Sequence, residues 1–107
     1  MINNKARGNR AEREIVHLMQ DWGYEAIGSK ASRGAADVIA WNDEEIRFIQ
    51  SKNESRKGAY TEDLERLKKM KCPPNGKREL WIRQRGRSWI RKTIMNDGTI
   101  TEDRFNA

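Results

Sequence analysis

The chain has 107 residues and a mass of 12.5 kDa, which predicts one domain over residues 1–107 and excludes a second core. Hydrophobic and charged residues each make up 36% of the sequence, so the core must be thin and a large enclosed ligand cavity is not expected. The formal net charge is +6, and the single cysteine and single histidine exclude an internal disulfide and a Cys/His zinc site.

The amino-terminal segment is polar and basic, unlike a signal peptide. No apolar run approaches the length of a membrane span. The sequence therefore predicts a cytoplasmic protein with no membrane partner, or a protein of the host-cell cytoplasm if a phage or virus encodes it.

The positive charge is concentrated in one stretch. Residues 66–92 carry eleven Lys or Arg against one acid, Glu79, which is a local charge of +10 and leaves −4 for the rest of the chain. A basic segment beside an acidic one is typical of a phosphate-binding surface next to a metal site, although a solvated basic face has the same composition. The candidate DNA contacts in this stretch are Arg83, Arg85 and Arg87.

The first predicted element is an amphipathic helix. Apolar residues recur at helical spacing from Ala11 to Trp22, which predicts a helix over residues 9–22 that ends at Gly23. A short strand is expected over residues 24–27. Residues 28–34 then form a loop of Ser, Gly, Lys and Arg, which we expect to be basic and flexible.

Two β-rich stretches follow the loop. Residues 35–41 and residues 46–52 are separated by a polar turn at residues 42–44. This arrangement predicts a hairpin.

A second helix is expected over residues 61–70, with Thr61 as its N-cap and acids in its first turn. The last elements are three short strands over residues 79–84, 88–95 and 99–104. A turn at residues 96–98 closes the hairpin between the last two of them. Trp81 and Trp89 are expected to pack in the sheet or at a dimer interface rather than to stack on bases. The order αβββαβ with a terminal extension predicts an α/β fold.

The hairpin carries the candidate catalytic residues. Side chains two apart on a strand share a face, so Gln50 and Lys52 point the same way. Asp37, on the partner strand, converges with them if the register brings it there. A carboxylate and a backbone carbonyl, such as that of Ser51, bind a hard divalent cation, and a lysine orients or activates the attacking water. The pattern favours metal-dependent hydrolysis.

Glu12 joins this group through its place on the first helix. At about 100° per residue it lies between Val16 and Met19, towards the buried stripe, whereas Glu14 is turned away. Burying an unpaired charge is unfavourable, so we expect Glu12 to meet a metal ion, Lys52 or an arginine. The alternative is an acid that only favours the positive end of the helix dipole.

Structural roles are also open for the other two charged residues. Asp37 is alternatively a cap at the start of its strand, with Ser32 or Arg33 as partner. Lys52 is alternatively a solvated strand end.

Three segments of the first half form a joint pattern: residues 10–16 (RAEREIV), residues 32–40 (SRGAADVIA) with Ser29 before them, and residues 49–52 (IQSK). Together they resemble the archaeal-type Holliday junction resolvases, nucleases of the PD-(D/E)xK superfamily. The resemblance covers roughly residues 8–52, and after Pro73 it is mostly strand order. It implies a restriction-endonuclease-like fold, in which a mixed central sheet is flanked by helices.

The resemblance also implies roles for individual residues. The candidate catalytic and metal-site residues are Glu12, Asp37, Gln50, Ser51 and Lys52, with Lys52 as the catalytic lysine. The candidate DNA contacts in this half are Arg10, Arg13, Ser29, Lys30, Ser32 and Arg33. The family further implies a homodimer that cuts two opposed strands of a four-way DNA junction with Mg²⁺, for which Mn²⁺ is expected to substitute.

Gln50 departs from the family, which usually has glutamate at this place. An amide oxygen can bind magnesium but brings no charge, so metal affinity should drop unless Glu12 or another acid compensates. The residue is either a natural variant or an inactivating change.

Two other functions fit the same sequence. A related nuclease of this fold would act on duplex or flapped DNA, and substrate preference separates it from a resolvase. A DNA-binding module that has lost cleavage is the second alternative, and Gln50 is the residue that favours it. Metal-dependent cleavage that Asp37→Ala abolishes would exclude the binding module.

Overall fold

The computed structural model describes residues 4–28, 36–53, 60–85 and 88–106 of the chain. Along the chain the elements follow the order αβββαβββ. They are α1 (Asn4–Asp21), β1 (Glu25–Gly28), β2 (Val38–Trp41), β3 (Ile46–Asn53), α2 (Thr61–Lys69), β4 (Gly76–Arg83), β5 (Ser88–Ile94) and β6 (Ile100–Asn106). Within these ranges, no helix is both long enough and apolar enough to span a membrane.

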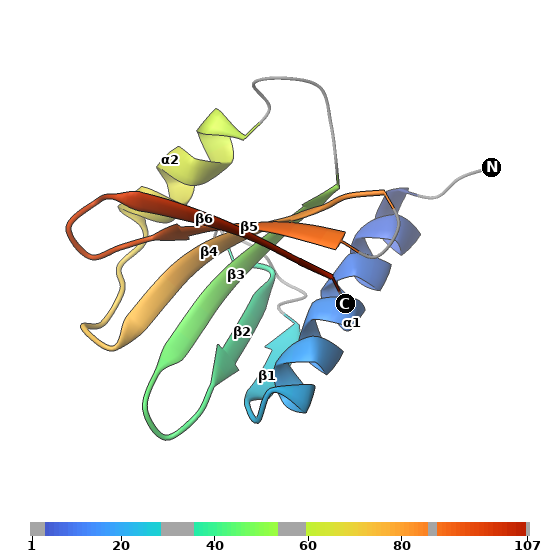
Figure 1. The fold of residues 1–107 in the computed structure, drawn as a ribbon, viewed down its shortest axis with the longest axis horizontal. Coiled ribbons are helices and arrows are strands. Elements are labelled where there is room, and N and C mark those ends of the chain that lie inside the picture. The colour runs from blue at the N-terminus through green and yellow to red at the C-terminus, as the bar shows by residue number, and fades with distance from the viewer. Residues whose placement is uncertain (1–3, 29–35, 54–59, 86–87, 107) are drawn as a thin grey trace.

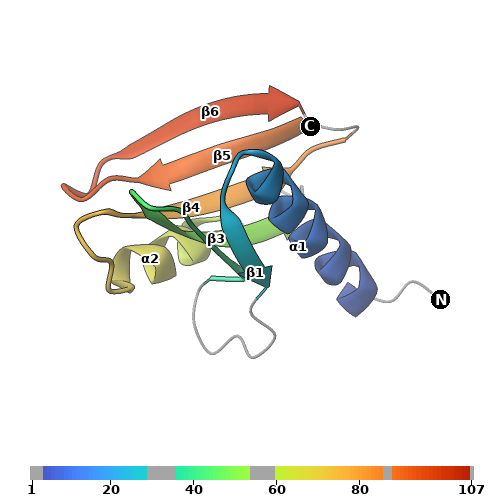
Figure 2. The ribbon, with the colours of Figure 1, turned by 90° about the horizontal axis from the view of Figure 1, so that it is seen from below.

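The strands form one six-stranded sheet in the order β1-β2-β3-β4-β5-β6. Among the described strands, β3 and β4 pair in parallel and the other neighbours pair antiparallel, so the expected mixed sheet is confirmed. The parallel pair needs a crossover connection, and α2 lies in it. The expected terminal extension is the hairpin of β5 and β6, and β6 forms an edge of the sheet beside β5 (Figure 2). Gly98, with a φ of 90°, lies in the turn between them.

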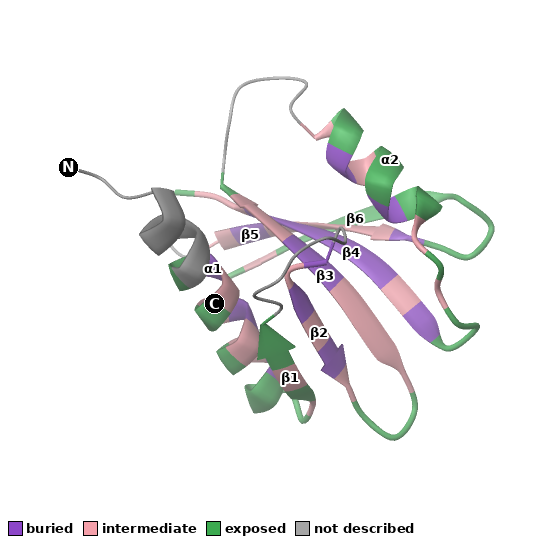
Figure 3. Ribbon diagram, turned by 180° about the vertical axis from the view of Figure 1, so that it is seen from behind, coloured by how far each residue is buried: buried purple, intermediate pink, exposed green. Residues whose placement is uncertain are grey.

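The two helices cover opposite faces of the sheet (Figure 1). Because side chains alternate along a strand, Trp81 packs with α1 while its neighbours Leu80 and Ile82 pack with α2. Ile15 of α1 and Leu67 of α2 are both fully buried in these two clusters. Figure 3 shows that β4 is buried along most of its length. The core therefore lies on both sides of the central strands.

The start of α1 was not predicted correctly. The helix begins at Asn4, five residues before the expected start at residue 9. The prediction relied on the spacing of apolar residues, whereas backbone hydrogen bonds can form helical turns that have no apolar face. The end of the helix was predicted. Gly23 has a φ of 92°, and the N–H groups of Gly23 and Tyr24 donate to the carbonyls of Gln20 and Met19 at 3.0 and 2.9 Å.

The N-cap of α2 was also predicted wrongly. The first helical hydrogen bond runs from the N–H of Leu64 to the carbonyl of Tyr60 at 3.0 Å, so Tyr60 is the N-cap and Thr61 is already helical. At the other end, Arg78 of β4 donates to the carbonyl of Lys68 at 2.8 Å. This guanidinium is buried and satisfies the carbonyl end of the helix. Arg78 is thus a structural cation rather than part of a DNA-binding face.

The two tryptophans pack in the core, as predicted. Trp81 and Trp89 are fully buried, with ring centroids 5.6 Å apart at an interplanar angle of 68°. Phe105 of β6 packs against Trp81 at 5.1 Å. These edge-to-face contacts attach the β5–β6 hairpin to the sheet, and neither indole is available to stack on a base.

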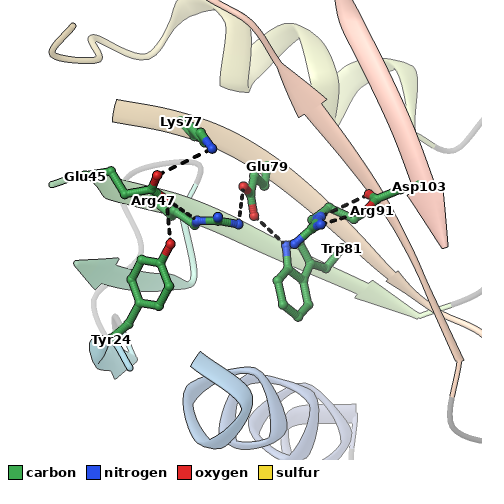
Figure 4. Close-up of polar contacts among 8 residues, drawn as sticks. All are labelled: Tyr24, Glu45, Arg47, Lys77, Glu79, Trp81, Arg91 and Asp103. Carbon is green, nitrogen blue, oxygen red and sulfur yellow. Dashed lines mark hydrogen bonds and ion pairs between the residues drawn. The ribbon is translucent and has the colours of Figure 1, made fainter. Parts of the chain in front are cut away.

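A polar network crosses β3 and β4 on the face that α1 covers (Figure 4). Arg47 donates to Glu45 at 2.6 Å and to Glu79 at 3.1 Å. The other oxygen of Glu79 accepts the indole N–H of Trp81 at 2.8 Å. Glu79 is 1% exposed, so its charge is stable there only because both oxygens have donors.

Candidate active site

Asp37 lies just before β2, where the pairing of β2 with β3 ends. The last pair in register is Val38 with Ile49, and the N–H of Asp37 donates to the carbonyl of Ile49 at 2.8 Å. Ser51 lies two residues further along β3, beyond the end of β2. Its N–H donates to Oδ2 of Asp37 at 3.0 Å, and its hydroxyl lies 3.3 Å from the same oxygen. The Asp37 carboxylate therefore replaces a backbone acceptor and is fixed at the ends of both strands.

Glu12 of α1 adjoins Asp37. A Cβ atom at Gly28 would lie 3.7 Å from Oε2 of Glu12 and 3.9 Å from the backbone oxygen of Asp37, so the three residues meet at one place. Partial burial raises the pKa of Glu12 above its ordinary value of 4.5, and the negative charge of Asp37 raises this pKa further. A divalent cation would offset the repulsion between the negative charges of these two neighbouring carboxylates.

Gln50 and Lys52 share one face of β3, as the strand period predicts. Both side chains reach Asp63 of α2: Nε2 of Gln50 lies 3.0 Å from its Oδ1, and Nζ of Lys52 lies 3.4 Å from the same oxygen. Gln50 is 7% and Asp63 3% exposed, whereas the Lys52 side chain is 41% exposed. The lysine is thus anchored at a buried acid while it still reaches solvent.

The amide oxygen of Gln50 has no hydrogen-bond partner among the described residues, although it is buried. A carboxylate only accepts hydrogen bonds, so the amide must turn its nitrogen to Asp63 and its oxygen elsewhere. A buried acceptor without a donor is rare in proteins and suits a cation.

The donor set of this region fits a hard divalent cation. Mg²⁺ prefers oxygen ligands, and the carboxylates of Glu12 and Asp37, the amide oxygen of Gln50 and the carbonyl of Ser51 are all oxygen donors. Among the described residues no three Asp, Glu, His or Cys side chains gather as a metal cluster. The candidate set therefore depends on neutral oxygens as well as on two acids.

The sequence of residues 3–98 matches the family described as archaeal Holliday junction resolvase (Hjc). The chain belongs to this family. No curated protein matches its sequence. The resolvase-family assignment agrees with the resemblance seen in the sequence, and it extends that resemblance over β4 and β5.

The fold of this resolvase-family chain is similar to that of a solved structure. Archaeoglobus fulgidus Hjc, a Holliday junction resolvase from an archaeal hyperthermophile, superposes with a TM-score of 0.64 at 15% sequence identity. The similarity covers 94% of this chain and 84% of the other. At this identity the match shows the fold, and it confirms the restriction-endonuclease-like architecture.

The structure divides the predicted site residues into two groups. Asp37 contacts Ser51 and adjoins Glu12, while Gln50 and Lys52 meet at Asp63. No hydrogen bond or ion pair joins the two groups in the described ranges. The expected convergence of Asp37 on Gln50 and Lys52 is not direct, because the ladder ends at Val38 and the carboxylate turns to the backbone of β3.

Sequence reasoning missed Asp63. It was interpreted as one of the acids that favour the start of a helix. A signal was present, since Asp63 lies four and seven positions before Leu67 and Met70, which pack on the sheet. An acid on the apolar stripe of a helix requires a partner, as was argued for Glu12.

The candidate DNA contacts are distributed unevenly. Arg10, Arg83 and Arg85 line an open pocket of about 440 Å³ beside Glu14 of α1 and Asn53, the last residue of β3. Arg13 is exposed on α1. The remaining candidates, Ser29, Lys30, Ser32, Arg33 and Arg87, lie outside the described residues.

Several cations of the long basic stretch pair with acids, and its interpretation as a phosphate-binding surface stays a prediction. Arg83 pairs with Glu14 at 2.9 Å and lies over the Trp89 ring at 4.9 Å. On β5, Arg91 pairs with Asp103 of β6 at 2.6 Å. Other cations of the stretch also pair with acids, namely Arg66, Lys68, Lys77 and Lys92. Six of the eleven cations of the stretch therefore lie within ion-pair distance of an acid outside it.

Proposed function

We propose that this chain is a Mg²⁺-dependent endodeoxyribonuclease that resolves four-way DNA junctions as a homodimer. Its membership of the resolvase family supports the substrate class. The observation that carries the catalytic part is that Asp37, which adjoins Glu12, accepts the N–H of Ser51, the residue between Gln50 and Lys52 on β3.

Four residues would hold the metal ion: Glu12 and Asp37 through carboxylates, Gln50 through its amide oxygen and Ser51 through its backbone carbonyl. Bound Mg²⁺ supplies an activated water and neutralises charge on the phosphate. The contact between Ser51 and Asp37 keeps the carboxylate at one position, so little reorganisation is needed when the ion binds.

Lys52 acts on the water or the phosphate. Its side chain is 41% exposed, so the ammonium can approach a phosphate oxygen at the surface, while Asp63 limits the positions that it samples. A lysine close to a bound metal ion would orient the attacking water and stabilise developing negative charge.

DNA binding uses surfaces separate from the metal site. Arg10 and Arg85 line the pocket next to the end of β3, and Arg13 is exposed on the same helix as Arg10. Arginines at these positions neutralise backbone phosphates and place the strand without reading its bases. Arg83, Arg87 and the loop residues Ser29, Lys30, Ser32 and Arg33 complete the proposed contacts.

The test compares substrates. The purified protein is incubated with a four-way junction and with linear duplexes of the same arms, at matched salt and with Mg²⁺ or Mn²⁺. We expect paired nicks in opposed strands of the junction and little cleavage of the duplex, because a dimer holds two sites at the spacing of a junction. Sedimentation should give a dimer. Equal cleavage of duplex or flapped DNA would instead identify the related nuclease.

Gln50 favours a second candidate, a DNA-binding module without cleavage. A neutral ligand in place of the usual glutamate lowers the charge available to the metal. Junction binding without cleavage in either metal would support this candidate. Cleavage that Asp37→Asn abolishes would exclude it.

A further inference from the structure

Asp63 lies at the centre of contacts that a helix-start acid does not need. Glu62, in the same turn of α2, is exposed, favours the helix dipole and pairs with Arg66 of the same helix at 3.9 Å. Asp63 is 3% exposed, and its Oδ1 meets both Gln50 and Lys52. A buried carboxylate is unfavourable unless donors surround it, so its position is explained by these two residues of β3.

The contact with Asp63 determines which atom of Gln50 is available. Because a carboxylate cannot donate, Nε2 must face it, and the only free acceptor of the amide is Oε1. An alanine or an apolar residue at position 63 would allow the amide to rotate. Asp63 therefore selects one of two amide orientations, the one in which the oxygen is directed away from the helix.

We propose that Asp63 is a positioning residue of the metal site: it turns the oxygen of Gln50 towards the ion and supplies, from α2, the negative charge that a glutamate on β3 would bring. This inference rests on the proposed function. Gln50 and Asp63 form an amide–carboxylate pair, and Lys52 is held by the same carboxylate. Gln50 is then a functional metal ligand with a compensating acid, and not an inactivating change.

The pair changes the effect expected of Gln50→Glu, which would tighten magnesium binding if position 50 had no acid beside it, because a charged ligand replaces a neutral one. With Asp63 in place, the substitution sets two carboxylates against each other where Nε2 and Oδ1 are now 3.0 Å apart. Like charges at this separation repel, and the new pair lacks a donor. The double variant Gln50→Glu/Asp63→Asn restores one donor and one acceptor with their places exchanged.

The experiment uses the wild type, Asp63→Asn, Gln50→Glu and the double variant, with Glu62→Gln as the matched control. Two quantities are measured in each protein: the melting temperature without metal and the Kd for Mg²⁺ by calorimetry. Junction cleavage by the wild type is measured separately. The metal-free melting temperature reports on the pairing of positions 50 and 63 independently of catalysis.

We expect Asp63→Asn to weaken Mg²⁺ binding by about 10- to 100-fold, as the loss of a residue that orients a ligand does. Gln50→Glu should lower the metal-free melting temperature. The double variant should recover the wild-type melting temperature and bind Mg²⁺ with a Kd within about threefold of the wild-type value. Glu62→Gln should leave the Kd unchanged.

Two results would overturn the inference while the proposed function survives. In the first, the wild type cuts junctions and Asp63→Asn has the same Kd for Mg²⁺ as the wild type. In the second, the double variant loses as much melting temperature and Mg²⁺ affinity as the two single variants lose together. A wild type that neither binds Mg²⁺ nor cuts DNA would remove the proposed function, and the role of Asp63 with it.

Discussion

The carboxylate of Asp37 accepts the backbone N–H of Ser51 at 3.0 Å, so one side chain both completes a strand ladder and adds an anion to the candidate metal site. Two substitutions of Asp37 distinguish its structural role from its role as a metal ligand. Asp37→Asn keeps an oxygen acceptor for Ser51 but removes the charge. We expect junction cleavage to fall by roughly 100-fold or more with an almost unchanged melting temperature.

Asp37→Ala removes both roles. The N–H of Ser51 loses its acceptor at a partly buried position, which should cost about 1–2 kcal/mol of unfolding free energy in addition to the loss of cleavage. Denaturant unfolding of both variants, with cleavage measured in parallel, makes the comparison. If Asp37→Asn cuts junctions at the wild-type rate, Asp37 does not hold the metal.

Lys52→Met tests the proposed catalytic lysine. It keeps the length of the side chain and removes the ammonium, so cleavage should be lost while junction binding stays within about threefold, because other cations bind the phosphates. Stability should also fall, since the buried Asp63 keeps the amide of Gln50 as a donor but loses its cation. Gel-shift and cleavage assays measure the two effects.

Lys92→Met is the matched control for Lys52→Met. Lys92 also pairs with an acid, Glu102 of β6, at 3.4 Å, but it lies on β5. We expect it to cut junctions normally. Equal losses of cleavage in the two variants would show that Lys52 acts through overall charge, and its catalytic assignment would then be wrong.

Periodicity along the sequence predicted the elements that pack locally. The face of α1 that carries Ile15 and Met19, the β2–β3 hairpin and the turn at Gly98 all follow from spacing and turn residues. The shared face of Gln50 and Lys52 on β3 follows from the same rule.

The parts that could not be predicted depend on contacts between distant segments. Asp63 was assigned to the helix dipole because only the docking of α2 on the sheet brings it to Gln50 and Lys52. Likewise, the partner of Arg83 is Glu14, at the other end of the chain, so the net charge of a stretch did not show which of its cations are free.

Arg10→Gln/Arg85→Gln tests the phosphate-binding surface. Both arginines line the pocket beside the end of β3. Each phosphate contact contributes about 0.9 to the slope of log K against log salt, so the double variant should flatten that slope by up to about 2 for junction and duplex DNA alike. Fluorescence anisotropy over a series of salt concentrations gives the slopes.

Arg66→Gln/Lys68→Gln is the control for this pair, because it removes the same charge from α2, where both cations already pair with acids. Its slope should remain near the wild-type value. A slope that falls equally in both double variants would mean that the arginines at the pocket form only a solvated basic face.

Glu45→Gln tests the polar network around Arg47 through its pH dependence. Burial alone would raise the pKa of Glu45, but the hydrogen bonds from Tyr24 and Arg47 outweigh burial and hold this pKa below its ordinary value of 4.5. A carboxylate whose pKa is lower in the folded than in the unfolded protein stabilises the fold above the unfolded pKa. That stabilisation is lost as the pH falls through the folded value.

At pH 7, Glu45→Gln should therefore unfold with about 1–2 kcal/mol less free energy than the wild type, since the hydrogen bonds it loses are charge-assisted. The difference should shrink as the pH falls from 4.5 towards the lower pKa of the folded state, where the wild-type carboxyl takes up its proton. Urea unfolding of both proteins at pH 7 and through the acid range measures this difference in unfolding free energy.

Glu44→Gln, at an exposed neighbouring position, is the control and should show no such pH dependence. A Glu45→Gln deficit that is the same at every pH would show that the network acts through packing and not through the charge of Glu45.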